Sequence, residues 1–517
     1  MPSQLSGTKK VARTRRGWFF WCCLLCAVPV LLPIYPPMVD APQHAAQVAA
    51  LRHLLAGDDW TYSGFFELQL FTPYIVGYLL VLMLSWLVEI PLAVKLVVAA
   101  AVVAFPLAGA RLADEASRGG AWRWMLLPLP FGFAYQWGFL NFLVAAPLGM
   151  LFLFEVIRAR ERGGWRSGLL IALWLHLLFV AHILTAFFFG VVGMLLLAAP
   201  WSGFRGWIRR SVPVFSVLPV AILWMWLNRS NAPSSEAMVI WNIGIHRVVE
   251  FLPGLVSSPD KLVGQLVGLL FMAMPFLLGA KPKQEAGEWM PFVFYLLWML
   301  LFPHYLAGTF FTYQRFGIFG LPLYMLAFDW RGAGAGRQEY LRSLVPGLVL
   351  VCLSLLGWQA IRASTFNREV AGYREVIAHA QPEKRLLTMA FDPISKASVA
   401  PLMVHFGSWY QAEKDGLAEY SFSEFWGVPA RFRSGAPTVI WQGFEWRPDL
   451  FEWDGYRGEL YDYFLIRHPQ SAEHWMAERS GGRVVLLARS AEWQLYARSD
   501  QVAAAPPHSR SNQENRP

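Results

Sequence analysis

The sequence predicts a polytopic α-helical membrane protein that ends in a small C-terminal α/β extracytoplasmic domain. Of the 517 residues, 56% are hydrophobic and 15% are charged, whereas a typical soluble domain carries about 25% charged residues. Apolar runs close to the length of a membrane crossing fill residues 18–363, and frequent charges replace them from residue 364 onward. Most of the chain is therefore expected to lie in lipid.

The predicted organisation has four parts. The first apolar run follows a basic stretch, which stays in the cytoplasm, and it lacks a small-residue cleavage site, so we expect an uncleaved helix. This orientation indicates a multi-pass protein of the bacterial inner (cell) membrane. The parts are a cytoplasmic N-terminus at 1–17, a transmembrane domain at 18–363 with a first outer loop at 36–67, a periplasmic α/β domain at 364–500, and a disordered tail at 501–517.

The order of basic loops limits the number of crossings. Basic loops at 111–123, 158–166, 205–210 and 281–283 are expected on the cytoplasmic side. The loop at 111–123 is expected inside and the loop at 36–67 outside, so an odd number of crossings must lie between them. Two apolar runs lie there, 68–88 and 92–110, and one of them should therefore not cross the membrane. We therefore predict about eleven transmembrane helices. The apolar runs are 18–35, 68–88, 92–110, 123–136, 138–157, 168–183, 184–200, 211–227, 263–280, 289–307, 314–330 and 344–363.

Several shorter elements follow from local patterns. Residues 45–56 are expected to form an amphipathic helix on the outer membrane surface. In the C-terminal part, the pattern predicts strands at 385–391, 438–441, 461–467, 484–487 and 493–497, and helices at 401–413 and 472–479. The net charge of +9 lies largely in short loops, where it orients the spans, so no nucleic-acid partner is predicted.

Asp40 and His44 stand where the first helix meets water, in the sequence PPMVDAPQH at 36–44. A carboxylate at this boundary suits a general base that removes a proton from a hydroxyl group. The alternative for Asp40 is a helix cap or a solvated loop residue. His44 lies one helical turn later and could orient Asp40, bind a phosphate or help to hold a metal; the alternative is a solvated or aromatic-stacked ring.

Other polar residues are expected at the outer ends of the spans. Arg315 is the main phosphate candidate, because its fork matches phosphate oxygens and it begins a membrane helix; interfacial snorkelling is its alternative. His182 and His304 could also be packing residues. The further substrate-binding candidates are Gln136, Asn141 and Glu67. The sequence contains no Gly-rich phosphate loop, which argues against an ATP-driven pump. It also lacks the His-Glu-x-x-His motif of zinc proteases and the Gly-x-Ser-x-Gly nucleophile elbow of serine hydrolases.

This pattern resembles the GT-C superfamily of membrane glycosyltransferases, such as protein O-mannosyltransferases and lipid A aminoarabinose transferases. The resemblance rests on the acid after the first helix, on the DAPQH sequence at 40–44, on the turn GFLNF at 138–142, and on the outer C-terminal domain. It implies that Asp40 is the catalytic base and that Arg315 binds the phosphate of a polyprenyl carrier. Metal-dependent members have a second acid where this chain has Gln136 and Asn141, so a divalent cation is only a possible cofactor.

The leading hypothesis is therefore transfer of a sugar from a polyprenyl-phosphate-linked donor to an acceptor on the outer face of the membrane. The expected partners are this lipid-linked sugar, membrane lipid, and a glycan, lipid or protein acceptor. Two alternatives remain open. The chain could be a non-enzymatic lipid or glycan transporter or assembly factor, or a GT-C-like protein that binds polyprenyl lipids without transferring sugar.

Overall fold

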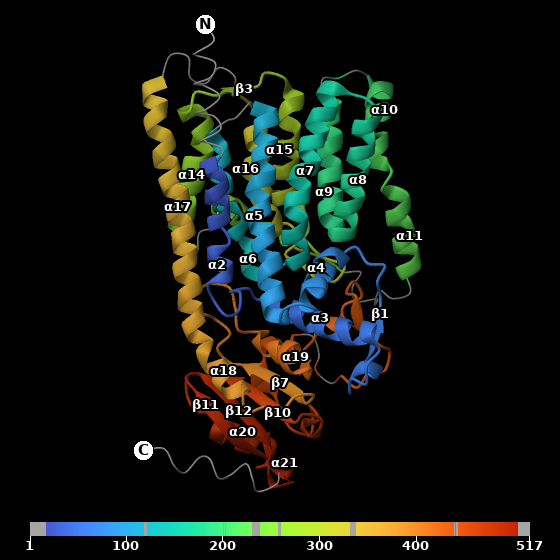
Figure 1. Cartoon of the computed structure of the whole chain (residues 1–517), viewed down its shortest axis with the longest axis vertical. Coiled ribbons are helices and arrows are strands. Elements are labelled where there is room, and N and C mark those ends of the chain that lie inside the picture. Colours follow the sequence, from blue (N-terminus) through green and yellow to red (C-terminus); the bar gives the residue numbers. More distant parts are fainter. Residues whose placement is uncertain are drawn as a thin grey trace.

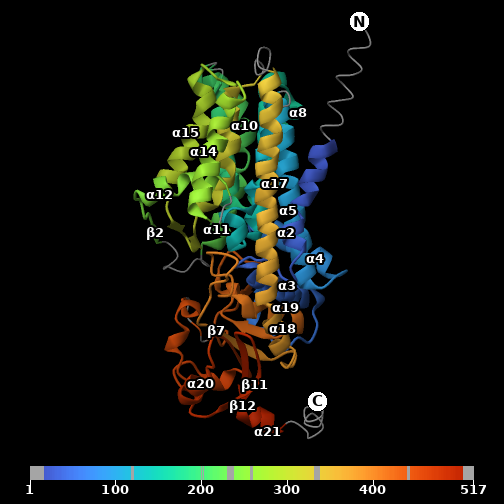
Figure 2. The same ribbon diagram turned by 90° about the vertical axis from the view of Figure 1, so that its left-hand side faces the viewer.

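The computed structural model describes residues 17–117, 121–199, 201, 203–229, 238–256, 260–330, 338–438, 440 and 443–504. Nearly all of the predicted cytoplasmic N-terminus and residues 505–517 of the predicted tail lie outside this set. A helical bundle, formed by residues 17–363, occupies one end of the molecule (Figure 1). The C-terminal part, residues 364–504, packs against its other end (Figure 2).

Three helices of the bundle are long and apolar enough to cross a membrane, and a bent pair would add a fourth among the described residues. The long helices are α5 (Ile90–Ser117), α7 (Leu140–Arg162) and α17 (Gln338–Glu369). The bent pair is α10 (Phe204–Phe215) and α11 (Leu218–Asn228). The shorter apolar helices are Gly17–Leu31 with its last turn α2 (Val28–Leu31), α8 (Trp165–Ala181), α9 (Ile183–Ala198), α14 (Lys261–Leu277), α15 (Ala286–Leu301) and α16 (Gly317–Leu326).

Two predicted spans are not continuous helices. In the run 68–88 only α4 (Ile75–Ser85) is helical; its 11 residues extend about 16 Å, too short for a bilayer core of about 30 Å. The short α4 agrees with the expectation that one of the runs 68–88 and 92–110 does not cross, and the number of crossings stays a prediction. The run 123–136 is broken into η2 (Ala121–Leu126), η3 (Leu129–Phe131) and α6 (Phe133–Trp137), because prolines at 128 and 130 lack the amide proton that an α-helix needs.

The helix after Asp40, α3 (Ala41–Ala56), lies between the bundle and the C-terminal part (Figure 1). The predicted amphipathic surface helix is wrong here, because every residue from 41 to 51 is buried. Its polar side chains are satisfied internally: the Gln43 amide donates to the Tyr420 carbonyl at 2.9 Å and accepts from the Phe422 backbone N–H at 3.0 Å. Buried glutamines that pair with backbone groups cost little, so polar residues in α3 do not mark a solvent face.

The C-terminal part contains a five-stranded mixed sheet in the order β11-β12-β10-β7-β8. β7 pairs in parallel with β8 and β10, while β12 pairs antiparallel with β10 and β11. The strands are β7 (Arg385–Ala390), β8 (Leu417–Glu419), β10 (Tyr463–Arg467), β11 (Val484–Ser490) and β12 (Trp493–Arg498); the helices are α18 (Ala371–Ile377), α19 (Trp409–Lys414) and α20 (Glu473–Ser480).

These elements match most of the predicted ones. The helix predicted at 401–413 starts only at η6 (Phe406–Ser408), and the strand predicted at 438–441 falls largely outside the described residues. The sequence missed β8 and also β9 (Ala430–Phe432), which pairs antiparallel with β1 (Phe66–Leu68) of the first outer loop. Short strands of three residues carry too little alternation to be recognised.

A continuous hydrophobic core joins the C-terminal part to the bundle. The Tyr35 ring, just after α2, lies 5.3 Å from the Phe406 ring and 4.8 Å from the Trp409 ring. Its hydroxyl donates to Glu413 Oε1 at 2.5 Å. The two parts therefore share one apolar core, and residues from both can be held at fixed positions in one site.

His53, near the end of α3, forms a second connection to the C-terminal part through Asp415. We expect the strength of this connection to depend on pH. The His53 ring nitrogens lie 2.8 Å from Asp58 Oδ2 and 2.8 Å from Asp415 Oδ1. Burial alone would lower the pKa of His53, but the hydrogen bonds with Asp415 and Asp58 outweigh it and raise the pKa above 6.5. The hydrogen bond from His53 lowers the pKa of Asp415 below 3.8.

The sign of the effect follows from these shifts. The raised pKa of His53 adds stability that is complete below about pH 6.5 and is lost as the pH rises through the raised value. The lowered pKa of Asp415 adds stability above about pH 4 that is lost on further acidification. We expect His53→Gln to lower the unfolding temperature of the detergent-solubilised protein by about 1 °C at pH 5.5 and by less at pH 8.5. Equal losses at both pH values would contradict the charged contact.

Candidate functional site

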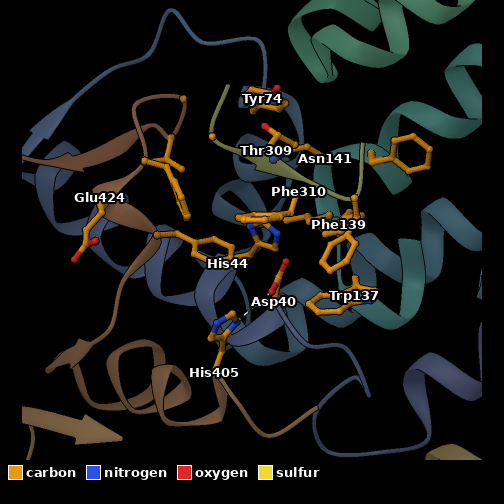
Figure 3. Close-up of a pocket in the computed structure, with 18 of the residues that line it drawn as sticks. Asp40, His44, Tyr74, Trp137, Phe139, Asn141, Thr309, Phe310, His405 and Glu424 are labelled. Atoms are coloured by element: carbon orange, nitrogen blue, oxygen red, sulfur yellow. Dashed lines mark hydrogen bonds and ion pairs between the residues drawn. The ribbon is translucent and has the colours of Figure 1, made fainter. Parts of the chain in front are cut away.

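A cavity of about 830 Å³ lies where the bundle meets the C-terminal part. Both parts supply its walls, and Figure 3 shows how the side chains converge. Five of the predicted site residues line it: Asp40, His44, Asn141, His182 and Arg315. Residues far apart in the sequence thus meet in one cavity, as is typical of ligand sites.

Asp40 occupies the N-cap position of α3, yet its side chain makes no capping hydrogen bond. Its backbone N–H donates to the Trp137 carbonyl at 3.0 Å, which fixes the residue against the turn before α7. The side chain is 10% exposed, and Oδ1 lies 3.1 Å from His405 Nδ1. The Asp40 side chain therefore does not cap the helix. Its carboxylate faces the cavity instead (Figure 3).

Gly138 permits the close approach of this turn to Asp40. Its φ is +83°, and a Cβ atom there would lie 2.8 Å from the Asp40 backbone nitrogen. A residue with a side chain would be strained at this φ and would also displace Asp40. The GFLNF sequence at 138–142 thus contributes the turn that positions the acid. Asn141 of the same sequence connects this turn to α4, because its Oδ1 accepts a hydrogen bond from the Gly77 N–H at 3.0 Å.

His405 is the histidine that contacts Asp40, whereas the sequence singled out His44. His44 Nδ1 instead lies 2.8 Å from the Tyr78 hydroxyl. Burial lowers the pKa of His44 to about 4, against the opposing effect of the Asp40 charge. The ring is therefore neutral at pH 7 and brings no positive charge to a phosphate. The prediction that His44 orients Asp40 is corrected: His405 has that geometry.

Arg315 lies at the start of α16, in η5 (Gln314–Phe316), and is 5% exposed. Its Nε donates to the Phe311 carbonyl at 3.1 Å, one Nη donates to the Phe310 carbonyl, and the other lies 3.3 Å from His182 Nε2. These three contacts use three of the five guanidinium N–H groups, leaving two that no described residue accepts. The guanidinium is buried rather than snorkelled, and it interacts electrostatically with Asp40.

The predicted residues Gln136, His304 and Glu67 do not line the cavity. The Gln136 carbonyl accepts the Val39 N–H at 3.1 Å, so this residue acts through its backbone. His304 Nδ1 contacts the Gln314 amide at 2.8 Å. Glu67 forms an ion pair with Arg431 across β1 and β9. The structure therefore does not bring these three residues together with Asp40 and Arg315 in the cavity.

Aromatic side chains and two carboxylates that the sequence did not single out complete the cavity. Tyr74 and Tyr78 line the bundle side, and the C-terminal part adds the residues Tyr420, Phe422, Glu424, Phe425, Trp426, Glu445 and Trp446. No motif in the sequence connects them, since they reach the cavity from loops around β9 and η8 (Phe444–Trp446). Among the described residues, no three His, Cys, Asp or Glu side chains are grouped as metal ligands.

No protein-family model and no curated protein sequence matches this chain. Solved structures do match. The arabinofuranosyltransferase AftD from Mycobacteria aligns with a TM-score of 0.51 and 15% identity, over 92% of this chain and 40% of its own. ArnT from Cupriavidus metallidurans, bound to undecaprenyl phosphate, aligns with a TM-score of 0.54 and 11% identity, over 93% of this chain and 98% of its own.

The present chain thus spans about two fifths of AftD and nearly the whole of ArnT. At these identities the likeness concerns the fold, and it covers the bundle and the C-terminal part together. These two matches support the fold that the sequence pattern resembles. The chain has a GT-C-like fold.

Proposed function

We propose that the protein is a membrane glycosyltransferase that moves a sugar from a polyprenyl-phosphate donor to an acceptor on the outer face of the membrane. The observation that carries the proposal is the convergence of Asp40 and Arg315 in one cavity with bundle and C-terminal walls. A structural neighbour, ArnT, was solved with undecaprenyl phosphate bound. That lipid class combines a phosphate, which suits Arg315, with an apolar tail, which suits a site next to the membrane.

The proposed reaction assigns one role to each side of the cavity. Asp40 accepts the proton of an acceptor hydroxyl while that oxygen forms a bond to the anomeric carbon of the donor sugar. The bond between this carbon and the phosphate oxygen breaks, and the phosphate leaves with the electron pair. His405 holds the Asp40 carboxylate in position through the contact at 3.1 Å. His405 is a positioning residue, because it acts through Asp40.

The leaving group requires a positive partner, and Arg315 supplies it. Its two remaining N–H groups can bind phosphate oxygens, and charge that develops on the phosphate is stabilised most strongly in a dry, preorganised site. His182 keeps the guanidinium in place from the turn between α8 and α9. No step in this scheme passes through a metal ion.

The membrane orientation is part of the same proposal. The basic ends of α7 and α8 lie at the end of the bundle opposite the C-terminal part (Figure 1). Because basic loops stay in the cytoplasm, the cavity and residues 364–500 would face the outside of a bacterial inner membrane. The proposal keeps about eleven crossings, with α4 as the short exception.

The direct test is a donor-turnover assay with the full-length protein in membrane vesicles. Vesicles are supplied with a panel of polyprenyl-phosphate-linked pentoses and hexoses, and both transfer and release of labelled sugar are measured. We expect at least one donor to be consumed. Binding of undecaprenyl phosphate with no turnover of any donor would favour the lipid-binding alternative. Absence of both would favour the transporter or assembly-factor alternative.

A further inference from the structure

The wall that the C-terminal part contributes differs in charge from the bundle wall. Glu424 and Glu445 line the cavity from the C-terminal part, whereas Arg315 is the one Arg or Lys among the described lining residues and belongs to the bundle. In Figure 3, Glu424 lies across the cavity from Trp137 and Phe139, which belong to the turn beside Asp40. An anionic group would be attracted to Arg315 on the bundle wall, whereas the described lining residues of the C-terminal wall include no Arg or Lys to balance its charge.

Two polar groups on the C-terminal wall are free to bind a ligand. The Tyr420 side chain is 8% exposed, and its hydroxyl makes no hydrogen bond to any residue that the structure describes. The Glu424 carboxyl likewise has no hydrogen-bond partner in the described part of the chain. Neither group is sealed in the protein interior, because both residues line the cavity, so a ligand that enters it can reach the hydroxyl and the carboxyl.

Tyr420 lies within electrostatic range of Glu445 and Glu424 and also of Asp40. Burial, followed by the charges of Glu445, Glu424 and Asp40, raises the pKa of Tyr420, so all three acids lie within electrostatic range of its ring. Burial, and then the charges of Glu419 and Glu445, raise the pKa of Glu424 to about 8. At pH 7 the Glu424 carboxyl is mostly protonated and can both donate and accept hydrogen bonds.

Aromatic rings flank these polar groups. Phe422 packs against Phe425 with ring centroids 5.3 Å apart, and Trp426 stacks on Trp224 of α11 at 4.9 Å. Trp446, which is 47% exposed, stands at the edge of the cavity. A sugar ring presents apolar C–H faces and a rim of hydroxyl groups. Aromatic surface suits the faces, and carboxyl and phenol groups suit the rim.

Resting on the proposed function, we infer that the C-terminal wall binds the acceptor and that this acceptor is an uncharged carbohydrate rather than a phosphorylated lipid headgroup. Glu424, Glu445 and Tyr420 bind the hydroxyl groups of its terminal sugar, and Trp446 packs against the ring. The donor phosphate occupies the opposite wall at Arg315. The acceptor hydroxyl then lies on the Tyr420 side of Asp40, where its proton can be removed.

The test measures glycan binding without any donor. Full-length protein in detergent is exposed to immobilised neutral tetrasaccharides of hexoses and of pentoses, and to the same tetrasaccharides carrying one phosphate. We expect binding of at least one neutral tetrasaccharide, and binding of its phosphorylated counterpart that is weaker by about tenfold or more. Glu424→Ala with Glu445→Ala should weaken neutral binding by about tenfold or more. Trp446→Ala, at an exposed position that tolerates truncation, should also weaken it.

The control variant is Glu459→Ala, which removes an acid of the C-terminal part that is paired with Arg457 and does not line the cavity. It should bind glycans as the native protein does. Preference for the phosphorylated tetrasaccharides, no binding of any neutral one, or unchanged binding by both the double variant and Trp446→Ala would overturn the inference. Undecaprenyl phosphate binding is measured on the same preparations. Retained lipid binding with no glycan binding would reject the acceptor inference alone, whereas glycan binding without any donor turnover would reject the proposed function.

Discussion

Asp40→Asn should lower sugar transfer by about a hundredfold or more while leaving donor binding within a few-fold of the native value. The asparagine side chain has nearly the same shape and can keep the contact with His405, but its amide cannot accept a proton from the acceptor. The loss should therefore appear in kcat and not in KM for the donor. The measurement is initial-rate transfer in membrane vesicles with expression matched by immunoblot.

The matched control is Asp59→Asn, which removes an exposed acid of the same outer loop. It should retain native rates. His405→Ala offers a graded comparison, because it removes the group that orients Asp40 but leaves the carboxylate; we expect a smaller loss of about tenfold. Native turnover by Asp40→Asn would exclude Asp40 from the mechanism, and a loss confined to KM would make it a binding residue.

Arg315→Lys should weaken undecaprenyl phosphate binding and lower transfer by about tenfold to a hundredfold. The native guanidinium reaches the Phe311 and Phe310 carbonyls and still has two N–H groups to offer. A lysine keeps the charge but cannot hold this fork, so it cannot bind phosphate oxygens at the same place. Binding is measured by titrating the purified protein with undecaprenyl phosphate.

Arg229→Lys is the control, because Arg229 is an exposed residue at the C-terminal end of α11 and does not line the cavity. It should change neither binding nor transfer. The unfolding temperature of Arg315→Lys is measured in parallel, so that lost packing is separated from lost recognition. Native lipid affinity in a folded Arg315→Lys protein would reject Arg315 as the phosphate ligand.

The sequence identified the residues whose surroundings are local. Asp40 could be predicted because a helix end and a proline-framed turn place it at the boundary between membrane and water. Arg315 could be predicted because placing a charged side chain at the start of a membrane helix costs free energy unless the charge has a partner. His405 could not be predicted, since it is 365 residues from Asp40 in the chain and belongs to no motif.

The errors have related causes. The burial of α3 depends on Gln43 bonding to backbone groups around Tyr420 and Phe422, a contact that no local pattern encodes. Glu67 resembled a free acid because its partner, Arg431, lies in a strand only three residues long. In this sequence, the turns and helix ends predicted the position of the site better than the polar residues alone did.

The contact between Asp40 and His405 has a consequence for how the protein matures. Asp40 leaves the ribosome early, but the imidazole that holds its carboxylate is encoded after the last helix of the bundle. During synthesis the finished bundle thus carries an acid without its positioning group and a cavity without its second wall. In a new chain, Asp40 lacks its partner His405 and the cavity lacks its second wall until the final quarter of the polypeptide has folded, so the cavity is completed only at the end of biogenesis.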